Sequence, residues 1–225
     1  LGLAKTRLAR LISDAVEGDF KRIQFTPDLL PSDLIGASIY LASENRFEFQ
    51  RGPVFGNFVL ADEINRAPAK VQSALLEAME ERQVTSGETT HKLAWPFFVI
   101  ATQNPVEHEG TWDLPQAQMD RFLMQVNVDY PTPDNERAIL DLAIEEAQDT
   151  VAPVKEVISQ ADLKEAQTEI AALHVSDLIR DYVVRLISGA RTDALKGVGE
   201  HLACPASPRG TIMLTRAAQA QAWLM

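Results

Sequence analysis

One stretch decides the fold, Phe58-Val59-Leu60-Ala61-Asp62-Glu63, in which four apolar residues are followed directly by two carboxylates. A short, continuous apolar run is typical of a strand that is buried on both faces, as in a parallel sheet. Open sheets of this kind bind their ligands beyond the carboxyl ends of the strands. The stretch therefore predicts a central strand whose tip presents two acidic side chains to a crevice.

Strand and helix patterns alternate on both sides of this stretch. Strands are predicted over residues 21–26, 97–101 and 122–128, the last two as buried apolar runs. Helices are predicted over residues 5–16 and after Pro68. In the second helix Gln72 falls on the polar face, opposite an apolar stripe formed by Val71, Ala74, Leu75, Ala78 and Met79. This alternation predicts an α/β fold with a parallel sheet flanked by helices.

Two hairpins and a run of helices complete the expected organisation. The hairpins are predicted over residues 38–50 and 83–93. Beyond Pro131 and Pro133 only helical patterns follow, with Ser159 and Ser176 at N-cap positions and helices over 134–148, 160–172, 177–189 and 209–224. We therefore expect an α/β domain over residues 1–130 and a small all-α domain over residues 131–225.

Composition excludes several classes of protein. The 225 residues include 21 basic and 32 acidic side chains, for a net charge of -11, and the excess lies in residues 53–150. A protein that coats a duplex needs basic patches, so this balance argues against nucleic acid as a partner. No apolar run approaches the roughly 20 residues that cross a bilayer. Cys204 is the single cysteine, so no internal disulfide can form, and we expect a cytoplasmic protein without a signal peptide.

The start of the chain contains a short phosphate-binding pattern. Gly2-Leu3-Ala4-Lys5-Thr6 opens a predicted helix. A phosphate-binding loop uses a lysine for the β- and γ-phosphates and a hydroxyl for Mg²⁺ at a helix N-terminus. Lys5 and Thr6 match that requirement, whereas Ala4 stands where the general pattern has glycine. Alone, so short a match is equally compatible with an ordinary helix start.

Polar residues at the ends of two predicted strands extend this pattern. Asp62 could hold Mg²⁺, and Glu63 could orient or deprotonate an attacking water. Asn104 follows the strand over residues 97–101 and could hydrogen-bond a γ-phosphate or that water. The simpler interpretations are a solvated acidic loop and an ordinary turn residue before Pro105. Since all three sites fall at compatible places in an α/β fold, the nucleotide interpretation is favoured.

Longer stretches resemble the MoxR family of AAA+ ATPases, in the helix-2-insert clade that is related to the ATPase subunits of magnesium chelatases. The resemblance covers nearly the whole chain and is strongest in residues 58–67, 72–84, 100–105, 114–122 and 206–209. It implies a P-loop NTPase core followed by a helical lid, with the chain truncated at both ends. Pro205 departs from the family, which usually has glycine there.

The resemblance also implies roles for individual residues. Nucleotide binding would fall to Gly2, Leu3, Ala4, Lys5 and Thr6, Mg²⁺ binding to Thr6 and Asp62, and catalysis to Glu63, Asn104, Arg121 and Arg209. Among the catalytic residues, Arg121 resembles the arginine finger that serves a neighbouring subunit, and Arg209 resembles sensor 2. Without the family, Arg121 could simply pair with Asp120 or Glu109, and Arg209 could be a solvated residue of a first helical turn.

The function implied by the family is Mg²⁺-dependent ATP hydrolysis in a homo-oligomeric ring, expected to be a hexamer. That activity would drive chaperone-like remodelling, protein maturation or metal insertion, with a von Willebrand factor A domain protein as a possible partner. One alternative is a nucleotide-responsive scaffold that scarcely hydrolyses ATP. Another alternative is a DNA-remodelling relative. The near absence of basic residues in the hairpin over 83–93, where Lys92 is the single one, argues against it.

Overall fold

Three parallel strands form the sheet in the computed structural model, which describes residues 5–87, 89–103, 111–148, 157–192, 202 and 204–225. The strand order is β1 (Phe20–Gln24), β4 (Phe58–Asp62), β7 (Phe98–Ala101). Every residue of β4 is buried, because it is the central strand and the sheet is covered on both faces. In this register Gln24 lies beside Asp62, so the carboxyl ends of β1 and β4 coincide.

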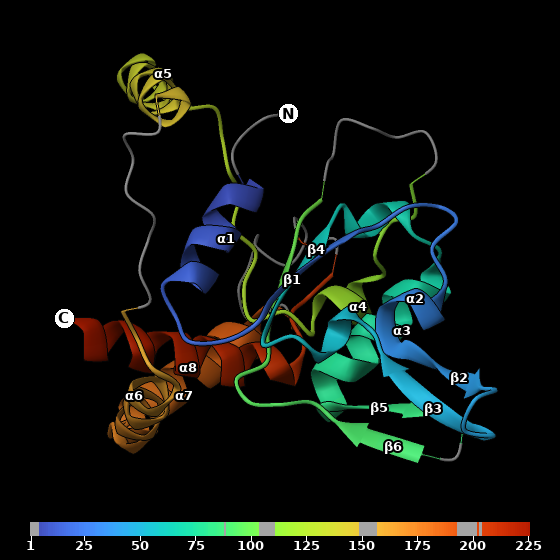
Figure 1. Ribbon diagram of the computed structural model, residues 1–225. Helices are drawn as coiled ribbons and strands as arrows, with labels where there is room; N and C mark the ends of the chain where they lie inside the picture. Colours follow the sequence, from blue (N-terminus) through green and yellow to red (C-terminus); the bar gives the residue numbers. More distant parts are fainter. Residues whose placement is uncertain (1–4, 88, 104–110, 149–156, 193–201, 203) are drawn as a thin grey trace.

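Helices cover both faces of the sheet. Figure 1 shows α1 (Lys5–Asp14) on one side of β1 and β4, with α2 (Pro31–Ile35) and α3 (Ala69–Glu81) on the other. The core between these layers is apolar and closely packed, and its fully buried side chains include Phe25, Leu34, Leu60, Leu75 and Leu76. The predicted α/β fold with a parallel sheet is confirmed.

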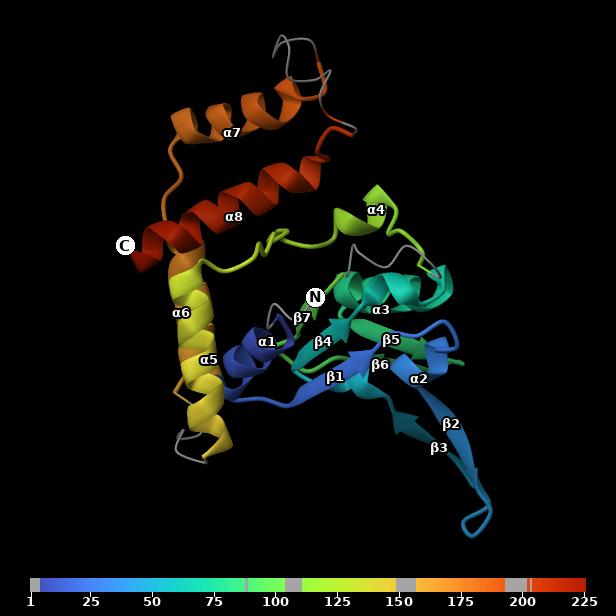
Figure 2. The same cartoon turned by 90° about the horizontal axis from the view of Figure 1, so that it is seen from above.

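Both predicted hairpins form. One consists of β2 (Gly36–Leu41) and β3 (Arg46–Arg51), and the other of β5 (Gln83–Ser86) and β6 (Thr89–Lys92). The β2–β3 hairpin projects away from the sheet (Figure 2). The rings of Phe49 and His91 stack with their centroids 4.1 Å apart, so the bases of the two hairpins are in contact.

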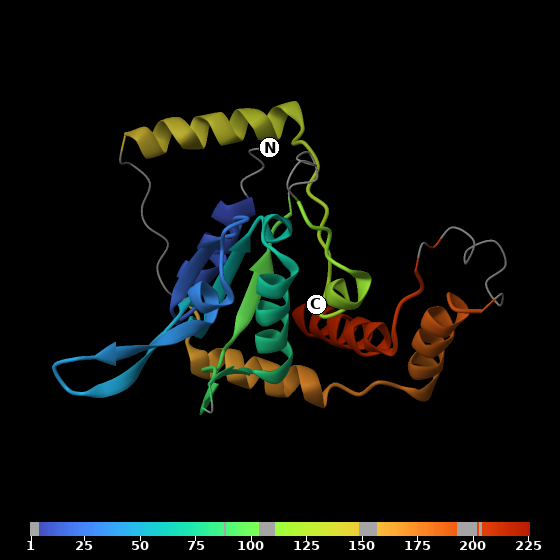
Figure 3. The ribbon, with the colours of Figure 1, turned by 90° about the vertical axis from the view of Figure 1, so that its right-hand side faces the viewer.

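The second half of the chain is helical. A short α4 (Gln116–Met119) is followed by α5 (Pro133–Ala147), α6 (Gln160–Ala172), α7 (Asp177–Gly189) and α8 (Pro208–Leu224). Ser159 and Ser176 cap α6 and α7 as predicted. Helix α8 packs on α6 and α7, whereas α5 lies apart from them (Figure 3) and reaches α1 through the Arg7–Glu146 ion pair.

None of the helices in the described part of the chain is both long and apolar enough to cross a membrane. A division into two domains at residue 131 stays a prediction.

Three predictions about local structure are wrong. Residues 98–101 form a strand as predicted, but none of them is buried and Phe98 is 47% exposed, because β7 is an edge strand of the described sheet. Residues 122–128 form no strand, and Leu123, Met124 and Val126 are 50%, 60% and 72% exposed. An apolar run becomes a buried strand only beside a pairing partner, and the one strand paired with β7 in the described residues is β4. Gln72, expected on the polar face of α3, is fully buried. Its amide nitrogen lies within hydrogen-bonding distance of backbone carbonyl oxygens outside α3, those of Ile64, Ala67 and Trp112. Helical periodicity alone could not reveal that burial.

Candidate active site

Asp62 is the point at which four elements meet. It ends β4 and is 7% exposed. Thr102, directly after β7, donates its hydroxyl to Asp62 Oδ1 at 2.5 Å. Arg22 of β1 approaches Oδ2 with Nε at 3.1 Å and Nη2 at 2.7 Å. Thr6, in the first turn of α1, donates its hydroxyl to the same oxygen at 3.2 Å. Parallel pairing therefore brings side chains from three neighbouring strands together beside the start of one helix.

The environment keeps the Asp62 carboxyl ionised. Burial by itself would raise the pKa of Asp62. The hydrogen bond from Thr102, the hydrogen bond and positive charge of Arg22, and the hydrogen bond from Thr6 outweigh that effect and hold the pKa below its ordinary value. Asp62 is thus a buried anion at neutral pH, with hydroxyl and guanidinium partners.

Glu63 is held in a backbone conformation that is uncommon for its residue type. Its φ of 56° and ψ of 50° lie in the left-handed region, which costs a non-glycine residue of the order of 1–3 kcal/mol. The Glu63 N–H donates to Thr102 Oγ1 at 2.9 Å. Its Oε2 accepts from Gln24 Nε2 at 2.9 Å and from Arg66 Nη1 at 3.1 Å. The turn therefore aims the carboxylate back toward the tip of β1.

Gln72 of α3 supports the loop that follows Glu63. Its Nε2 lies 3.2 Å from the carbonyl oxygen of Ile64 and 3.0 Å from that of Ala67. A third carbonyl oxygen, that of Trp112, lies 3.2 Å away. One buried amide thus links the start of α3, the loop after Glu63 and the segment before α4.

Arg121 and Arg209 form a second cluster around Glu80. Arg121 Nη2 lies 3.1 Å from Glu80 Oε2, and Arg209 Nη2 pairs with Glu80 Oε1. Glu80 comes eight residues after Gln72 in α3, so it lies about 12 Å further along the helix axis. Arg121 thus pairs with Glu80 and not with Asp120, while Glu109, the other acid considered, is outside the described residues.

The predicted site residues accordingly fall into two groups. Thr6, Asp62 and Glu63 lie together at the carboxyl end of the sheet. Arg121 and Arg209 lie together near the far end of α3. Lys5 begins α1, and Gly2, Leu3, Ala4 and Asn104 are outside the residues that the structure describes.

The residues of these clusters that were missed as site residues from the sequence include Arg22, Gln24, Thr102 and Glu80. A signal existed for Arg22 and Gln24, because they are two apart in a strand and so share one face next to Asp62. Thr102 immediately follows a predicted strand and could have been singled out as Asn104 was. No local pattern marks Glu80, whose partners are distant in the sequence.

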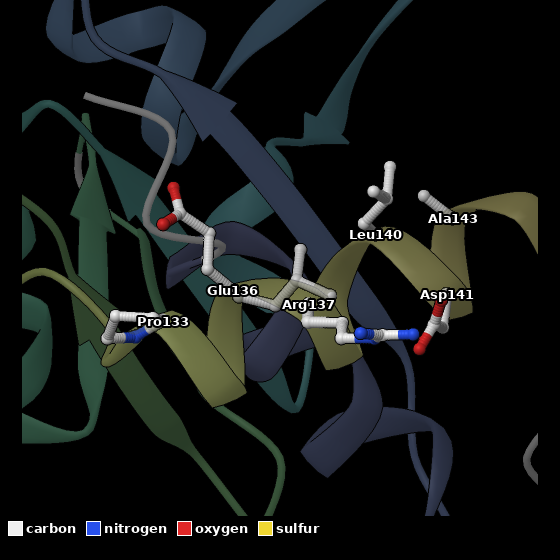
Figure 4. Close-up of a pocket in the computed structure, with 7 residues that line it drawn as sticks. Pro133, Glu136, Arg137, Leu140, Asp141 and Ala143 are labelled. Carbon is white, nitrogen blue, oxygen red and sulfur yellow. The ribbon is translucent and has the colours of Figure 1, made fainter.

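Of two hollows on the described surface, one lies away from these clusters and the other lies at the arginine cluster. The larger, of about 760 Å³, is open and is lined by residues of α5 alone, among them Glu136, Arg137 and Leu140 (Figure 4). It contains none of the predicted site residues. The smaller, of about 140 Å³, is lined by the arginine cluster together with Met79 and Met213.

Comparison with known proteins adds an independent observation. Residues 1–124 match the model of a family described as ATPases associated with various cellular activities (AAA). The chain is 46% identical over 224 residues to the chaperone MoxR1 of Mycobacterium tuberculosis, covering 98% of this chain and 58% of that protein. It is 35% identical over 243 residues to the protein MoxR of Paracoccus denitrificans, covering 100% and 70%.

Two further proteins extend the comparison. The uncharacterised protein YeaC of Bacillus subtilis is 47% identical over 223 residues, covering 99% of this chain and 67% of that protein. A crystal structure from Cytophaga hutchinsonii, described as that of a candidate ATPase, superimposes with a TM-score of 0.88 at 45% identity. It covers 99% of this chain and 68% of its own. The chain thus spans roughly three fifths to two thirds of the length of these proteins.

Proposed function

Because the chain belongs to the MoxR family of AAA+ ATPases, we propose that the protein hydrolyses Mg²⁺-bound ATP to remodel other proteins. One observation carries this proposal, namely the contact of Thr6 with Asp62 beside Glu63 at the carboxyl end of β4. A hydroxyl oxygen and an ionised carboxylate are hard ligands of the kind Mg²⁺ prefers, so the donor set fits that ion. Bound there, Mg²⁺ would neutralise charge on the phosphates.

The remaining roles at this site are assigned by family resemblance. Lys5, with the backbone of Gly2, Leu3 and Ala4, binds the phosphates, and Thr6 and Asp62 hold the metal ion. Glu63 orients the attacking water and accepts its proton, as a carboxylate at this place in P-loop enzymes can. Its hydrogen bonds with Gln24 and Arg66 support this role because they restrict where the carboxylate points. Asn104 contacts the γ-phosphate or the water.

Arg121 and Arg209 act, in this proposal, on nucleotide bound by a neighbouring subunit of a ring. Both pair with Glu80, about 12 Å along α3 from the support of the Glu63 loop. A guanidinium suits a developing phosphoryl charge because it is planar, permanently charged and rich in donors. A ring of six subunits is the assembly that the family implies.

The client protein, the partner and the cellular location are also part of the proposal. A relative carries the name chaperone MoxR1, which supports chaperone-like remodelling over a DNA-directed activity. Protein maturation or metal insertion, a von Willebrand factor A domain partner and a cytoplasmic location complete the proposal. The acidic balance of the chain supports a protein client, because duplex binding needs basic patches.

Glu63→Gln tests the reaction. The amide keeps the shape of the side chain but accepts no proton, so we expect ATP binding to persist in the full-length protein while turnover falls about 10²-fold or more. Bound nucleotide measured by equilibrium titration, and phosphate release measured on the same samples, separate the two effects. Glu77→Gln, at an exposed position of α3, is the matched control and should turn over normally. Normal turnover by Glu63→Gln would remove Glu63 from the mechanism, whereas ATP binding with negligible turnover by the wild type would favour the scaffold alternative.

A further inference from the structure

One carboxylate joins the two arginines that are proposed to act together. Glu80, in the last turn of α3, uses Oε2 for Arg121, 3.1 Å away, and Oε1 for Arg209. Arg121 follows α4, and Arg209 lies in the first turn of α8. Figures 1 and 3 show these three helices as neighbours. A residue of the α/β layer therefore links segments that are far apart in the sequence.

The position of Glu80 between two arginines has an electrostatic consequence. Two guanidinium groups that share a small hollow repel each other, and the carboxylate between them offsets this repulsion. The side chains of Arg121, Glu80 and Arg209 are 30%, 35% and 41% exposed, so solvent screens these pairs less than it screens fully exposed ones. Pairing also holds two long, flexible side chains in one place, which reduces the conformational entropy that they must lose during the reaction.

A second contact joins the same two segments. Ser207 Oγ lies 2.7 Å and 2.6 Å from the carboxylate oxygens of Asp120, to which it donates its hydroxyl hydrogen. The same oxygen accepts from the backbone N–H of Arg209 at 3.0 Å and so caps α8. Asp120 directly precedes Arg121. The backbone positions beside both arginines are therefore tied together independently of Glu80.

We propose that Glu80 is a positioning residue that presents Arg121 and Arg209 to the neighbouring subunit as one unit. This inference rests on the proposed function, since it assigns Glu80 to the same reaction. Ser207 and Asp120 bring the two backbones together, and Glu80 sets the two side chains. A guanidinium has five N–H donors, so pairing with one carboxylate leaves donors for a phosphate.

The test uses the full-length protein with Glu80→Gln, which keeps the size of the side chain and removes its charge. We expect kcat to fall at least tenfold while the Kd for ATP, measured with a fluorescent analogue, and the KM stay within about twofold. Glu80→Asp keeps the charge on a shorter side chain and should recover part of kcat. Glu81→Gln, the exposed neighbour, is the control and should match the wild type.

A double-mutant cycle separates positioning from a general structural effect. If Glu80 acts through the arginines, Glu80→Gln will cost much less in an Arg209→Ala background than in the wild type. Additive losses would overturn the inference. Should Glu80→Gln fail to fold, Glu80→Asp decides alone: a lowered kcat at unchanged Kd supports positioning, and a wild-type kcat overturns it.

Controls at the main site distinguish failure of this inference from failure of the proposed function. If Glu63→Gln and Arg121→Ala stop turnover while Glu80→Gln leaves it unchanged, Glu80 has no positioning role and the ATPase proposal stands. If Glu63→Gln and Arg121→Ala both turn over normally, the roles proposed for these two residues fail, whatever Glu80→Gln does. If the wild-type protein binds ATP without turning it over, the ATPase proposal itself fails.

Discussion

Thr102 serves two acidic neighbours with one hydroxyl group. It donates to Asp62 Oδ1 and accepts from the N–H of Glu63, and it is itself buried. The hydroxyl thus compensates a buried anion and secures the strained backbone of Glu63 at the same time. Losing the hydroxyl would leave the buried Asp62 Oδ1 and the partly buried Glu63 N–H without this partner. A buried polar group without a partner costs its full desolvation free energy.

Thr102→Val is therefore expected to lower the free energy of unfolding by about 1–3 kcal/mol at pH 7. Since Thr102 helps hold the pKa of Asp62 below its ordinary value, that stabilisation is present above the unfolded pKa of about 3.9 and is lost as pH falls through the folded value. Urea unfolding at pH 7 and pH 3 should show the difference shrinking in acid. Thr102→Ser, which keeps the hydroxyl, is the control; a pH-independent difference would contradict the link to Asp62.

Some site residues are marked by the sequence next to them, and others are marked only by partners that are distant in the sequence. Asp62 and Glu63 could be predicted because an apolar strand runs directly into them, and the strand end is where such sheets present ligands. Arg22 and Glu80 do not end a strand, so they could not be selected in this way. Their importance comes from partners that only the folded chain brings close.

Helices and strands could be predicted where the sequence pattern that defines them lies entirely within the element. Helices α5, α6, α7 and α8 follow from periodicity, and the caps at Ser159 and Ser176 mark two starts. The strand predicted over residues 122–128 failed because strands need a neighbour, which no local pattern guarantees. The start of α3 after Pro68 was predicted, but the burial of Gln72 depends on a loop from elsewhere in the chain.

Helix α3 connects both clusters, so a change at Gln72 should affect stability and activity together. Gln72→Met fills the same space without a donor and leaves the carbonyls of Ile64, Ala67 and Trp112 short of a partner. We expect a loss of about 1–3 kcal/mol in unfolding free energy and a lower kcat, because the loop after Glu63 is no longer held. Thermal unfolding and steady-state rates measure both effects.

Lys70→Met, exposed on the same helix, is the control for Gln72→Met and should change stability by no more than about 0.5 kcal/mol. Loss of stability with an unchanged kcat would show that Gln72 supports the fold but not the position of Glu63.

At the scale of the whole molecule, the two clusters lie in different places. The Asp62 cluster lies at the carboxyl end of the sheet, and the Glu80 cluster lies toward the other end of α3. Under the proposed function, one chain therefore carries a nucleotide-side group and an arginine group at different positions along α3. Such an arrangement is complementary to itself in a head-to-tail ring, where each interface combines one group from each subunit.

A mixing experiment tests that arrangement. We expect full-length Arg121→Ala to bind ATP without turning it over, because an arginine supplied by a neighbour contributes 10³–10⁵ in rate in related reactions. Full-length Lys5→Ala, which lacks the proposed phosphate lysine, should also be inactive. If interfaces act independently, equal mixing restores about one quarter of wild-type activity, since that share joins an intact Lys5 to a neighbour's intact Arg121. Differently tagged subunits verify co-assembly by affinity capture. Mixed rings that stay inactive at every ratio would place Arg121 outside the shared site.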